Sequence, residues 1–409
     1  MAADKTIVGL DIGTSSTRVA VGSVSRDGQL VIESVVERPS EGVKNGSIVN
    51  IEQTMKTISS VIGEAEVQAG TEISSVIIGI GGDQIKGIKS NGVVGINSKD
   101  QEITKDDIRR SIDVARNIQL PQNTEILHSL VQDFYVDSRS GIKDPVDMLG
   151  HRLDTKILLV LGSSPIIQNQ KKCVHKTGLQ VQKVVFQTLA DSEVVLSPEE
   201  KDMGAIVINI GSGSTNYIAY AGGAPVHVGG INRGSDLVTS DIAYLFQLPK
   251  AAAESLKLTD GSCYSPGIHD SDMMVTPALG GKPAIRMPRK EFAKVIEARM
   301  AEILLMIQQD LQDNQIQGPF GAGIVLVGGG ALMGGVTELA AEIFRLPCRI
   351  GFPEAISGLD RTYIDPKYST VLGLFKSEAK RYRDNNDISG VKEKKGFGSK
   401  VKSLFGKLF

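Results

Sequence analysis

Two short polar segments of the sequence, far apart in the chain, have the residue types that bind phosphate. The first begins at Asp11 and the second at Asn209; each follows an apolar run and turns through glycine and hydroxyl residues. The residues of the two loops that can contact a ligand are Asp11, Gly13, Thr14, Ser15, Ser16, Asn209, Gly211, Ser212, Gly213, Ser214 and Thr215. In such a hairpin turn, bare backbone N–H groups and hydroxyls can surround an anion. We therefore expect two facing loops that close on one phosphate chain.

A third glycine-rich segment is typical of a nucleotide site. Gly328, Gly329 and Gly330 follow a predicted strand over residues 324–327 and precede a predicted helix over residues 337–344. Glycine at such a junction lets the backbone approach a flat group closely, since a side chain there would block it. A single segment of this kind also occurs where a strand merely packs against a helix, so its meaning depends on the two phosphate loops.

Two charged residues complete the candidate site. Glu254 and Lys257 lie three positions apart on a predicted helix that begins at residue 250. Because side chains at this spacing share one face of a helix, both can point at the same ligand. Together with the loops and the glycine-rich segment, they predict a split nucleotide site.

The composition indicates a globular protein with a sizeable core. The chain has 409 residues, a hydrophobic fraction of 41% and a formal net charge of −2, so it has no overall field that would attract nucleic acid. Neither its 3 cysteines nor its 5 histidines have the spacing of a disulfide framework or a zinc site. The first residues do not resemble a secretory signal, and no run approaches the roughly 20 apolar residues of a membrane span. We therefore expect a cytosolic body without a nucleic-acid partner.

The order of the predicted elements is that of an α/β protein with duplicated halves. Strands at residues 7–10, 17–21 and 30–36 precede a helix at residues 52–66 and a buried strand at residues 76–80. This βββαβ order fits one half of a ribonuclease-H-like domain. The repeated phosphate loop predicts a second half of the same kind.

Residues 84–165 interrupt the first half as a small α/β insertion. Within them the sequence predicts a helix over residues 104–117, with Thr104 as its N-cap and Asp106 and Asp107 in its first turn. The predicted organisation is a first nucleotide-binding half at residues 1–83 and 166–202, the insertion at 84–165, a second nucleotide-binding half at 203–236 and 306–380, its smaller subdomain at 237–305, a flexible linker at 381–396 and a terminal amphipathic helix at 397–409.

The last residues of the chain predict attachment to a membrane surface. The apolar positions Phe397, Val401, Leu404, Phe405, Leu408 and Phe409 fall on one face of a helix, and Lys400, Lys402 and Lys407 take its other faces. A helix of about 13 residues extends roughly 20 Å, so it cannot cross a bilayer but can lie in its surface with its lysines toward anionic headgroups. The alternative is a terminal helix that docks on the protein's own core. The polar linker before it favours the membrane.

These features resemble the superfamily of actin, sugar kinases and heat-shock chaperones. Within it the chain is similar to the FtsA family, the bacterial actin homologues of cell division. The resemblance is carried by the run from Gly9 to Ser15, by the stretch from Asp144 to Gly150 with Arg152 and Leu153, and by Ala253 and Glu254 with Leu256 and Lys257. Members of this family lack one small subdomain of actin and have a different one inserted on another side of the molecule. Residues 84–165 occupy the position of that inserted subdomain.

The resemblance implies that ATP binds between the two halves. It implies that Asp11 holds the hydration shell of a Mg²⁺ ion. It also implies that Thr14, Ser15 and Ser16 form hydrogen bonds with the terminal phosphates, opposite residues 211–215. By the same resemblance Glu254 and Lys257 contact the ribose, and the glycines at 328–330 contact the adenosine. This family usually has Asp where this chain has Asn209 and Asn216. Since an amide cannot act as a base, we expect binding with slow or no hydrolysis.

The resemblance also implies several partners. Members of this family bind the C-terminal peptide of the tubulin-like FtsZ, polymerise head to tail, attach to the cytoplasmic membrane at the division septum and recruit other proteins of the divisome. This predicts an actin-like ATP-binding filament that tethers the FtsZ ring. We expect the peptide site on the smaller subdomain, at the basic residues Arg286, Arg289, Lys294 and Arg299. For any one of these residues, a solvated helix face is an equal alternative.

Three other functions of the same superfamily compete with this interpretation. A sugar kinase would need an acidic base over a carbohydrate hydroxyl, and no motif marks one. A peptide-holding chaperone would need a large β domain after the nucleotide fold. A pilus-assembly actin homologue shares the fold and the insertion but would not be expected to carry the terminal amphipathic helix.

Overall fold

The first half of the chain is a sheet with helices on both faces. The computed structural model describes residues 5–25, 28–276, 284 and 286–390, with side chains described up to residue 382. Five strands pair in the order β11-β6-β1-β2-β3. Their bounds are β1 (Lys5–Ile12), β2 (Ser16–Val24), β3 (Leu30–Pro39), β6 (Ser75–Ile80) and β11 (Gln180–Phe186). β1 and β2 are antiparallel and form the predicted hairpin around the first phosphate loop, so the predicted βββαβ half is confirmed.

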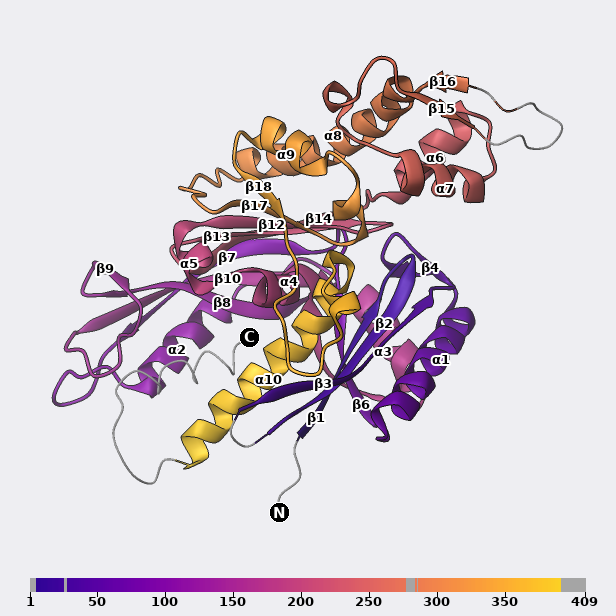
Figure 1. Cartoon of the computed structure of the whole chain (residues 1–409). Coiled ribbons are helices and arrows are strands. Elements are labelled where there is room, and N and C mark those ends of the chain that lie inside the picture. The colour runs from indigo at the N-terminus through magenta and orange to yellow at the C-terminus, as the bar shows by residue number, and fades with distance from the viewer. Residues whose placement is uncertain (1–4, 26–27, 277–283, 285, 391–409) are drawn as a thin grey trace.

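The helices of this half belong to two layers (Figure 1). α1 (Ile51–Ala69) and α3 (Ser164–His175) pack together on one face of the sheet, and α4 (Gln187–Val195) and α10 (Ser369–Gly390) pack together on the other. A minor hairpin, β4 (Val43–Lys44) and β5 (Ser47–Ile48), precedes α1. Thr54, Ile58 and Val61 of α1 are buried at a helical spacing, which explains why the sequence pattern located this helix.

The second sheet joins the second half to the inserted subdomain. Nine strands pair in the order β18-β17-β12-β13-β14-β7-β10-β8-β9. Their bounds are β7 (Lys86–Gly95), β8 (Thr124–Val136), β9 (Arg139–Ile142), β10 (Arg152–Ser163), β12 (Ala205–Ile210), β13 (Thr215–Ala221), β14 (Ala224–Ile231), β17 (Gly323–Val327) and β18 (Cys348–Ile350). One register pair, Gly229 with Lys86, links β14 to β7. The insertion therefore interrupts the first half in sequence, but its strands extend the sheet of the second half.

Two further helices complete these layers. In the insertion, α2 (Lys105–Arg116) begins after Thr104, whose hydroxyl accepts from the N–H of Asp107 while the Asp107 carboxylate accepts from the N–H of Thr104. This capping box confirms the predicted N-cap. α5 (Pro198–Met203) precedes β12 and was not predicted, because it is short and contributes no buried residue to a periodic pattern.

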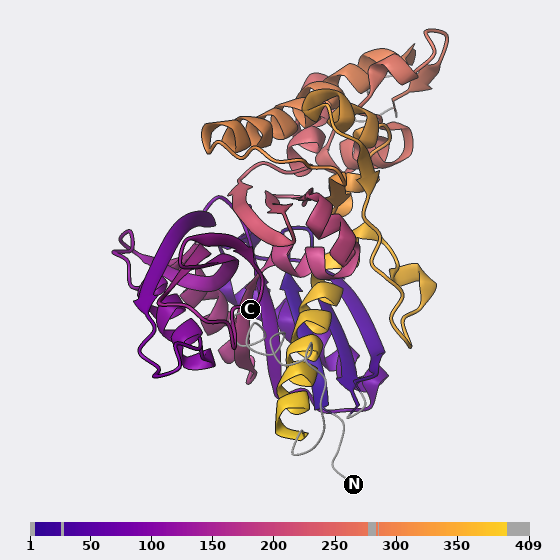
Figure 2. The ribbon, with the colours of Figure 1, turned by 90° about the vertical axis from the view of Figure 1, so that its left-hand side faces the viewer.

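The smaller subdomain lies beyond the second half and forms the upper end of the molecule in Figures 1 and 2. It contains α6 (Asp236–Leu245), α7 (Lys250–Asp260), the short pair β15 (Met273–Val275) and β16 (Arg286–Pro288), and the first part of α8 (Arg289–Asp313). α8 buries Phe292, Ile296 and Ile303 in a separate apolar cluster of this half. α9 (Val336–Phe344) packs against α8 and β17.

Part of the predicted linker belongs to a helix. Helix α10 runs to Gly390, so residues 381–390, which were predicted as part of the linker, are helical. The buried residues of α10, among them Val371, Leu374 and Phe375, anchor its first turns. Extending an existing helix then costs little per residue, even for a polar sequence. The predicted amphipathic helix at residues 397–409 lies outside the described residues, and within the described part of the chain no helix is long and apolar enough to span a bilayer.

Candidate functional site

The two predicted phosphate loops face one cavity. Each loop makes the same turn, since the N–H of Gly13 donates to the Ser16 carbonyl at 3.1 Å and the N–H of Gly211 donates to the Ser214 carbonyl at 3.0 Å. The residues of the two loops that line the cavity, whose volume is about 810 Å³, are Asp11, Gly13, Thr14, Ser15, Ser16, Asn209, Gly211, Ser212, Gly213 and Ser214. The duplicated sequence therefore gives the same backbone hydrogen bond in both loops that line the site.

The loops approach closely enough to require glycine at Gly213. A Cβ at this position would lie 2.5 Å from the Thr14 hydroxyl and 2.8 Å from the Cα of Asn45. Thr14 also accepts from the N–H of Gly46 at 2.9 Å, so its hydroxyl is held in place between the loops. Thr215 differs from the prediction, because its hydroxyl donates to the Arg233 carbonyl at 2.8 Å and the residue is not part of the cavity lining.

The glycine-rich segment lines another wall of the cavity. Gly328 has a φ of 82°, and a Cβ there would lie 2.4 Å from the Asn209 side-chain oxygen. A Cβ at Gly330 would lie 2.4 Å from Cγ2 of Ile210. At these two positions packing against β12 already requires glycine, whereas Gly329 meets open space. All three glycines line the cavity, and of the three Gly329 is the position at which a Cβ would meet open space.

Glu254 and Lys257 form an ion pair on α7 at the wall of the cavity. Nζ of Lys257 lies 2.7 Å from a carboxylate oxygen of Glu254 and donates to the Thr239 hydroxyl at 2.8 Å, while that hydroxyl donates to Glu254. Lys257 is 6% exposed, and Glu254 lies more in the open. The pair therefore shares one site, as the spacing predicts, with Lys257 as the buried support and Glu254 as the accessible group.

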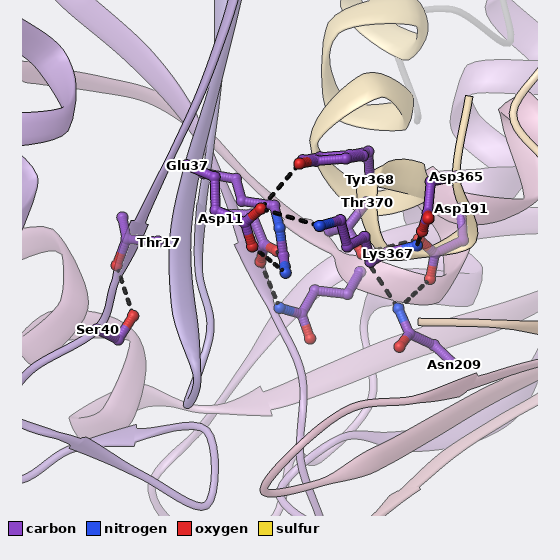
Figure 3. Close-up of polar contacts among 12 residues, drawn as sticks. Asp11, Thr17, Glu37, Ser40, Asp191, Asn209, Asp365, Lys367, Tyr368 and Thr370 are labelled. Carbon is purple, nitrogen blue, oxygen red and sulfur yellow. Dashed lines mark hydrogen bonds and ion pairs between the residues drawn. The ribbon is translucent and has the colours of Figure 1, made fainter. Parts of the chain in front are cut away.

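A cluster of charges that the sequence analysis missed lies beside Asp11. Arg18 lies 3.7 Å from the Asp11 carboxylate and 2.7 Å from Glu37, and Lys367 lies 3.3 Å from Glu37. Figure 3 shows Glu37 between Asp11 and Tyr368, whose hydroxyl donates to it at 2.8 Å. Burial alone would raise the pKa of Glu37, but Arg18, Tyr368 and Lys367 together lower it to about 2. One carboxylate thus holds two cations at the cavity.

Asp11 has an environment that fits a hard cation. Burial raises the pKa of this carboxyl, and Arg18 and a hydrogen bond from Gln187 oppose the rise. Among the described residues no group of three His, Cys, Asp or Glu side chains forms a metal cage. Mg²⁺ often binds proteins through only one or two carboxylates, with phosphates and water as its other ligands. Asp11 therefore fits a Mg²⁺ ion that a nucleotide brings with it.

The amide of Asn209 points toward an acid that the sequence analysis also missed. Nδ2 of Asn209 donates to the Asp191 carboxylate at 2.7 Å and to the Thr370 hydroxyl at 3.1 Å, and that hydroxyl donates to Asp191 at 2.8 Å (Figure 3). Asp191 lies on α4 and is 0% exposed. Burial raises its pKa to about 7, although both hydrogen bonds act in the opposite direction. No spacing in the sequence relates this residue to the second loop.

The four predicted basic residues of the smaller subdomain differ in how free their charges are. Arg299 contacts Asp241 at 2.6 Å and also Glu302, and Lys294 contacts Glu291 at 2.8 Å. Within the described part of the chain no ion pair involves Arg286 or Arg289, although Nε of Arg289 donates to the Asp260 carbonyl at 3.1 Å. The surface around β16 and the start of α8 therefore carries the available positive charge.

Comparisons with known proteins agree with this fold and site. Residues 206–373 match the family described as cell division protein FtsA, and residues 82–161 match the SHS2 domain inserted in FtsA. Cell division protein FtsA of Borreliella burgdorferi is 39% identical, with 98% of each chain covered. That of Pseudomonas aeruginosa is 36% identical over 94% of this chain and 92% of the relative.

Solved structures show the same architecture. The PilM-PilN type IV pilus biogenesis complex has a chain with a TM-score of 0.63 at 16% identity, which covers 91% of this chain and 98% of that one. MreB5 of Spiroplasma citri bound to ADP has a TM-score of 0.57 at 14% identity, which covers 94% and 99%. These likenesses show the actin-like fold. The identities above 30% over nearly the whole length show more: the chain belongs to the FtsA family of cell division proteins.

Proposed function

We propose that the protein is an actin-like filament subunit that binds ATP with Mg²⁺ and tethers the FtsZ ring to the cytoplasmic membrane at the division septum, where it helps to recruit the divisome. The observation that supports the nucleotide part is the pair of matching turns that line one cavity, at Gly13 and Gly211. Such paired turns present N–H groups and hydroxyls to a phosphate chain from two sides.

In the proposed complex the charges beside the loops support the phosphates. Arg18 and Lys367 supply positive charge, and both form ion pairs with Glu37, which holds them at the cavity. Asp11 would hold the hydration shell of Mg²⁺, and the ion would supply positive charge that offsets the charge of the phosphates. The open backbone at Gly329 receives the adenosine, and Glu254 receives the ribose.

We further propose that hydrolysis is slow or absent. The two side chains of the second loop and its strand that could act on water are the amides of Asn209 and Asn216, and an amide is not a base. Both amides are also engaged in hydrogen bonds within the protein, because Asn209 donates to Asp191 and Asn216 accepts from the N–H of Gly82 at 2.6 Å. A steady-state phosphate-release assay that measures several turnovers per second would contradict this proposal.

The surface around Arg286 and Arg289 is the proposed site for the acidic C-terminal peptide of FtsZ. Lys294 and Arg299 flank it, but their charges are shared with neighbouring carboxylates. Charge reversal at Arg286 and Arg289 should therefore weaken peptide binding at least tenfold in fluorescence anisotropy. The same reversal at Arg109, an exposed residue of α2, is the control. Equal affinities for the two variants would exclude this surface.

The tethering function is tested by flotation of liposomes with FtsZ. The full chain with ATP should carry FtsZ to anionic vesicles, and a chain that ends at Lys395 should not. A matched pair of variants separates insertion from charge: Phe405→Glu places an acid on the predicted apolar stripe, whereas Ser403→Glu adds the same charge off the stripe. Only Phe405→Glu should abolish flotation. Equal flotation of the full and the shortened chain would remove the membrane tether from the proposed function.

A further inference from the structure

A chain of three side chains crosses the floor of the cavity from the first half to the second. Gln187 is the first residue of α4, and its Nε2 donates to the Asp11 carboxylate at 2.8 Å. Its Oε1 accepts from Nδ2 of Asn216 at 3.3 Å. Oδ1 of Asn216 accepts from the N–H of Gly82 at 2.6 Å. The relay Asp11–Gln187–Asn216 therefore links β1, α4 and β13 and ends on the segment that leads into the inserted subdomain.

The direction of each amide in this relay is fixed at both ends. A carboxylate such as Asp11 only accepts, so it requires the NH₂ group of Gln187, and this turns the oxygen of Gln187 toward Asn216. At the other end the N–H of Gly82 only donates, so it requires the oxygen of Asn216 and turns the NH₂ group of Asn216 toward Gln187. Both ends demand the same polarity, and hence the hydrogen bonds support each other.

The backbone beside the relay lies so close to the two amides that it has little room for side chains at Gly79 and Gly81. A Cβ at Gly81 would lie 2.3 Å from Oε1 of Gln187 and 2.6 Å from Nδ2 of Asn216. A Cβ at Gly79 would lie 3.1 Å from Cγ of Gln187. The glycine-rich passage at the end of β6 is thus explained by the space that the two amides occupy.

We propose that Gln187 is a positioning residue, which acts through Asp11 on the Mg²⁺-dependent part of nucleotide binding and ties that carboxylate to the second half through Asn216. The inference rests on the proposed binding of ATP with Mg²⁺. Removing a hydrogen-bond partner from a carboxylate that meets a metal commonly costs tenfold to a hundredfold in metal affinity. Because Gln187 reaches the cation only through Asp11, its removal affects binding with Mg²⁺ more than binding without it.

The test measures the ATP dissociation constant of the full chain in Mg²⁺ and in EDTA, and the readout is the constant in EDTA divided by the constant in Mg²⁺. Gln187→Ala should lower this ratio about tenfold or more. Gln170→Ala is the matched control, because the Gln170 amide is buried in the same region and donates to the Gly79 carbonyl at 3.2 Å, outside the relay. If both substitutions only loosened the wall of the cavity, the ratio would fall in both variants. If the relay positions Asp11, the ratio should fall only in Gln187→Ala.

A double-mutant cycle tests the relay itself. Asn216→Ala should lower the same ratio by a smaller factor, and the double variant with Gln187→Ala should equal Gln187→Ala alone, since the relay is already broken. Additive effects, or a ratio in Gln187→Ala that equals that of Gln170→Ala, would overturn the inference and leave the proposed nucleotide binding intact. A wild-type chain that binds ATP in neither condition would overturn both.

Discussion

Replacing Asp191 by asparagine should change how the stability of the protein depends on pH. In the folded protein the buried carboxyl keeps its proton up to a pKa of about 7, whereas in the unfolded chain it releases the proton near its usual value of 3.8. Between these values the unfolded state binds fewer protons at this group than the folded state does. The group therefore contributes stability that is fully present below about pH 4 and is lost as pH rises to about 7.

The magnitude follows from the distance between the two pKa values. A difference of about three units at about 1.4 kcal/mol per unit gives a loss of about 4 kcal/mol in the unfolding free energy between pH 4 and pH 7. Asparagine at position 191 does not titrate and still accepts from Asn209, so the variant should not show this loss. The stability of Asp191→Asn relative to wild type should thus rise by up to about 4 kcal/mol over this range.

Thermal unfolding of nucleotide-free protein in EDTA, followed by far-UV circular dichroism, measures the effect. This probe suits a chain without tryptophan. Asp113→Asn, an exposed aspartate of α2, is the control and should follow the pH dependence of wild type. If Asp191→Asn also followed the pH dependence of wild type, the raised pKa of the buried Asp191 carboxyl would be refuted.

Two further predictions concern the cavity charges and the insertion. Lys367→Ala should weaken ATP binding several-fold at low salt and less at high salt, because the lysine is about one-third exposed and its charge is screened there. An equal loss at all salt concentrations in calorimetric titrations would argue against a charge effect. Thr104→Ala removes the hydroxyl of the capping box on α2 and should cost about 1 kcal/mol. Hydrogen exchange should report this as faster opening of α2, and unchanged exchange there would contradict it.

Features that depend on local pattern could be predicted from the sequence. The two loops share a glycine at Gly13 and Gly211 and a serine three residues later, and the N–H of each glycine donates to the carbonyl of that serine, so the repeated turn follows from the repeated sequence. Thr104 could be identified as an N-cap because Asp107 stands three positions later, and both hydrogen bonds are present. The apolar residues of α1 and α8 recur at helical spacing because one face of each helix is buried.

Features that depend on long-range contacts could not be predicted. Gln187 meets Asp11 across 176 positions of sequence, and Thr370 meets Asp191 across 179, so no local spacing connects them. Pairing of Gly229 with Lys86 joins the strands of the insertion to those of the second half within one sheet through a single position, which leaves no periodic signal. Residues 381–390 were predicted as linker because they are polar, whereas they continue helix α10, whose buried residues lie earlier in the chain.

The central claim, that the two loops close on one nucleotide, is tested most directly by calorimetric titration of the full chain with ATP and Mg²⁺. Wild-type protein should bind one ATP per chain. Gly213→Ala should abolish binding, because its Cβ would lie 2.5 Å from the Thr14 hydroxyl of the opposite loop. Gly63→Ala on α1, where a Cβ meets nothing within 4 Å, should bind as wild type does. If wild type did not bind ATP, or if Gly213→Ala bound it equally well, the claim would be contradicted.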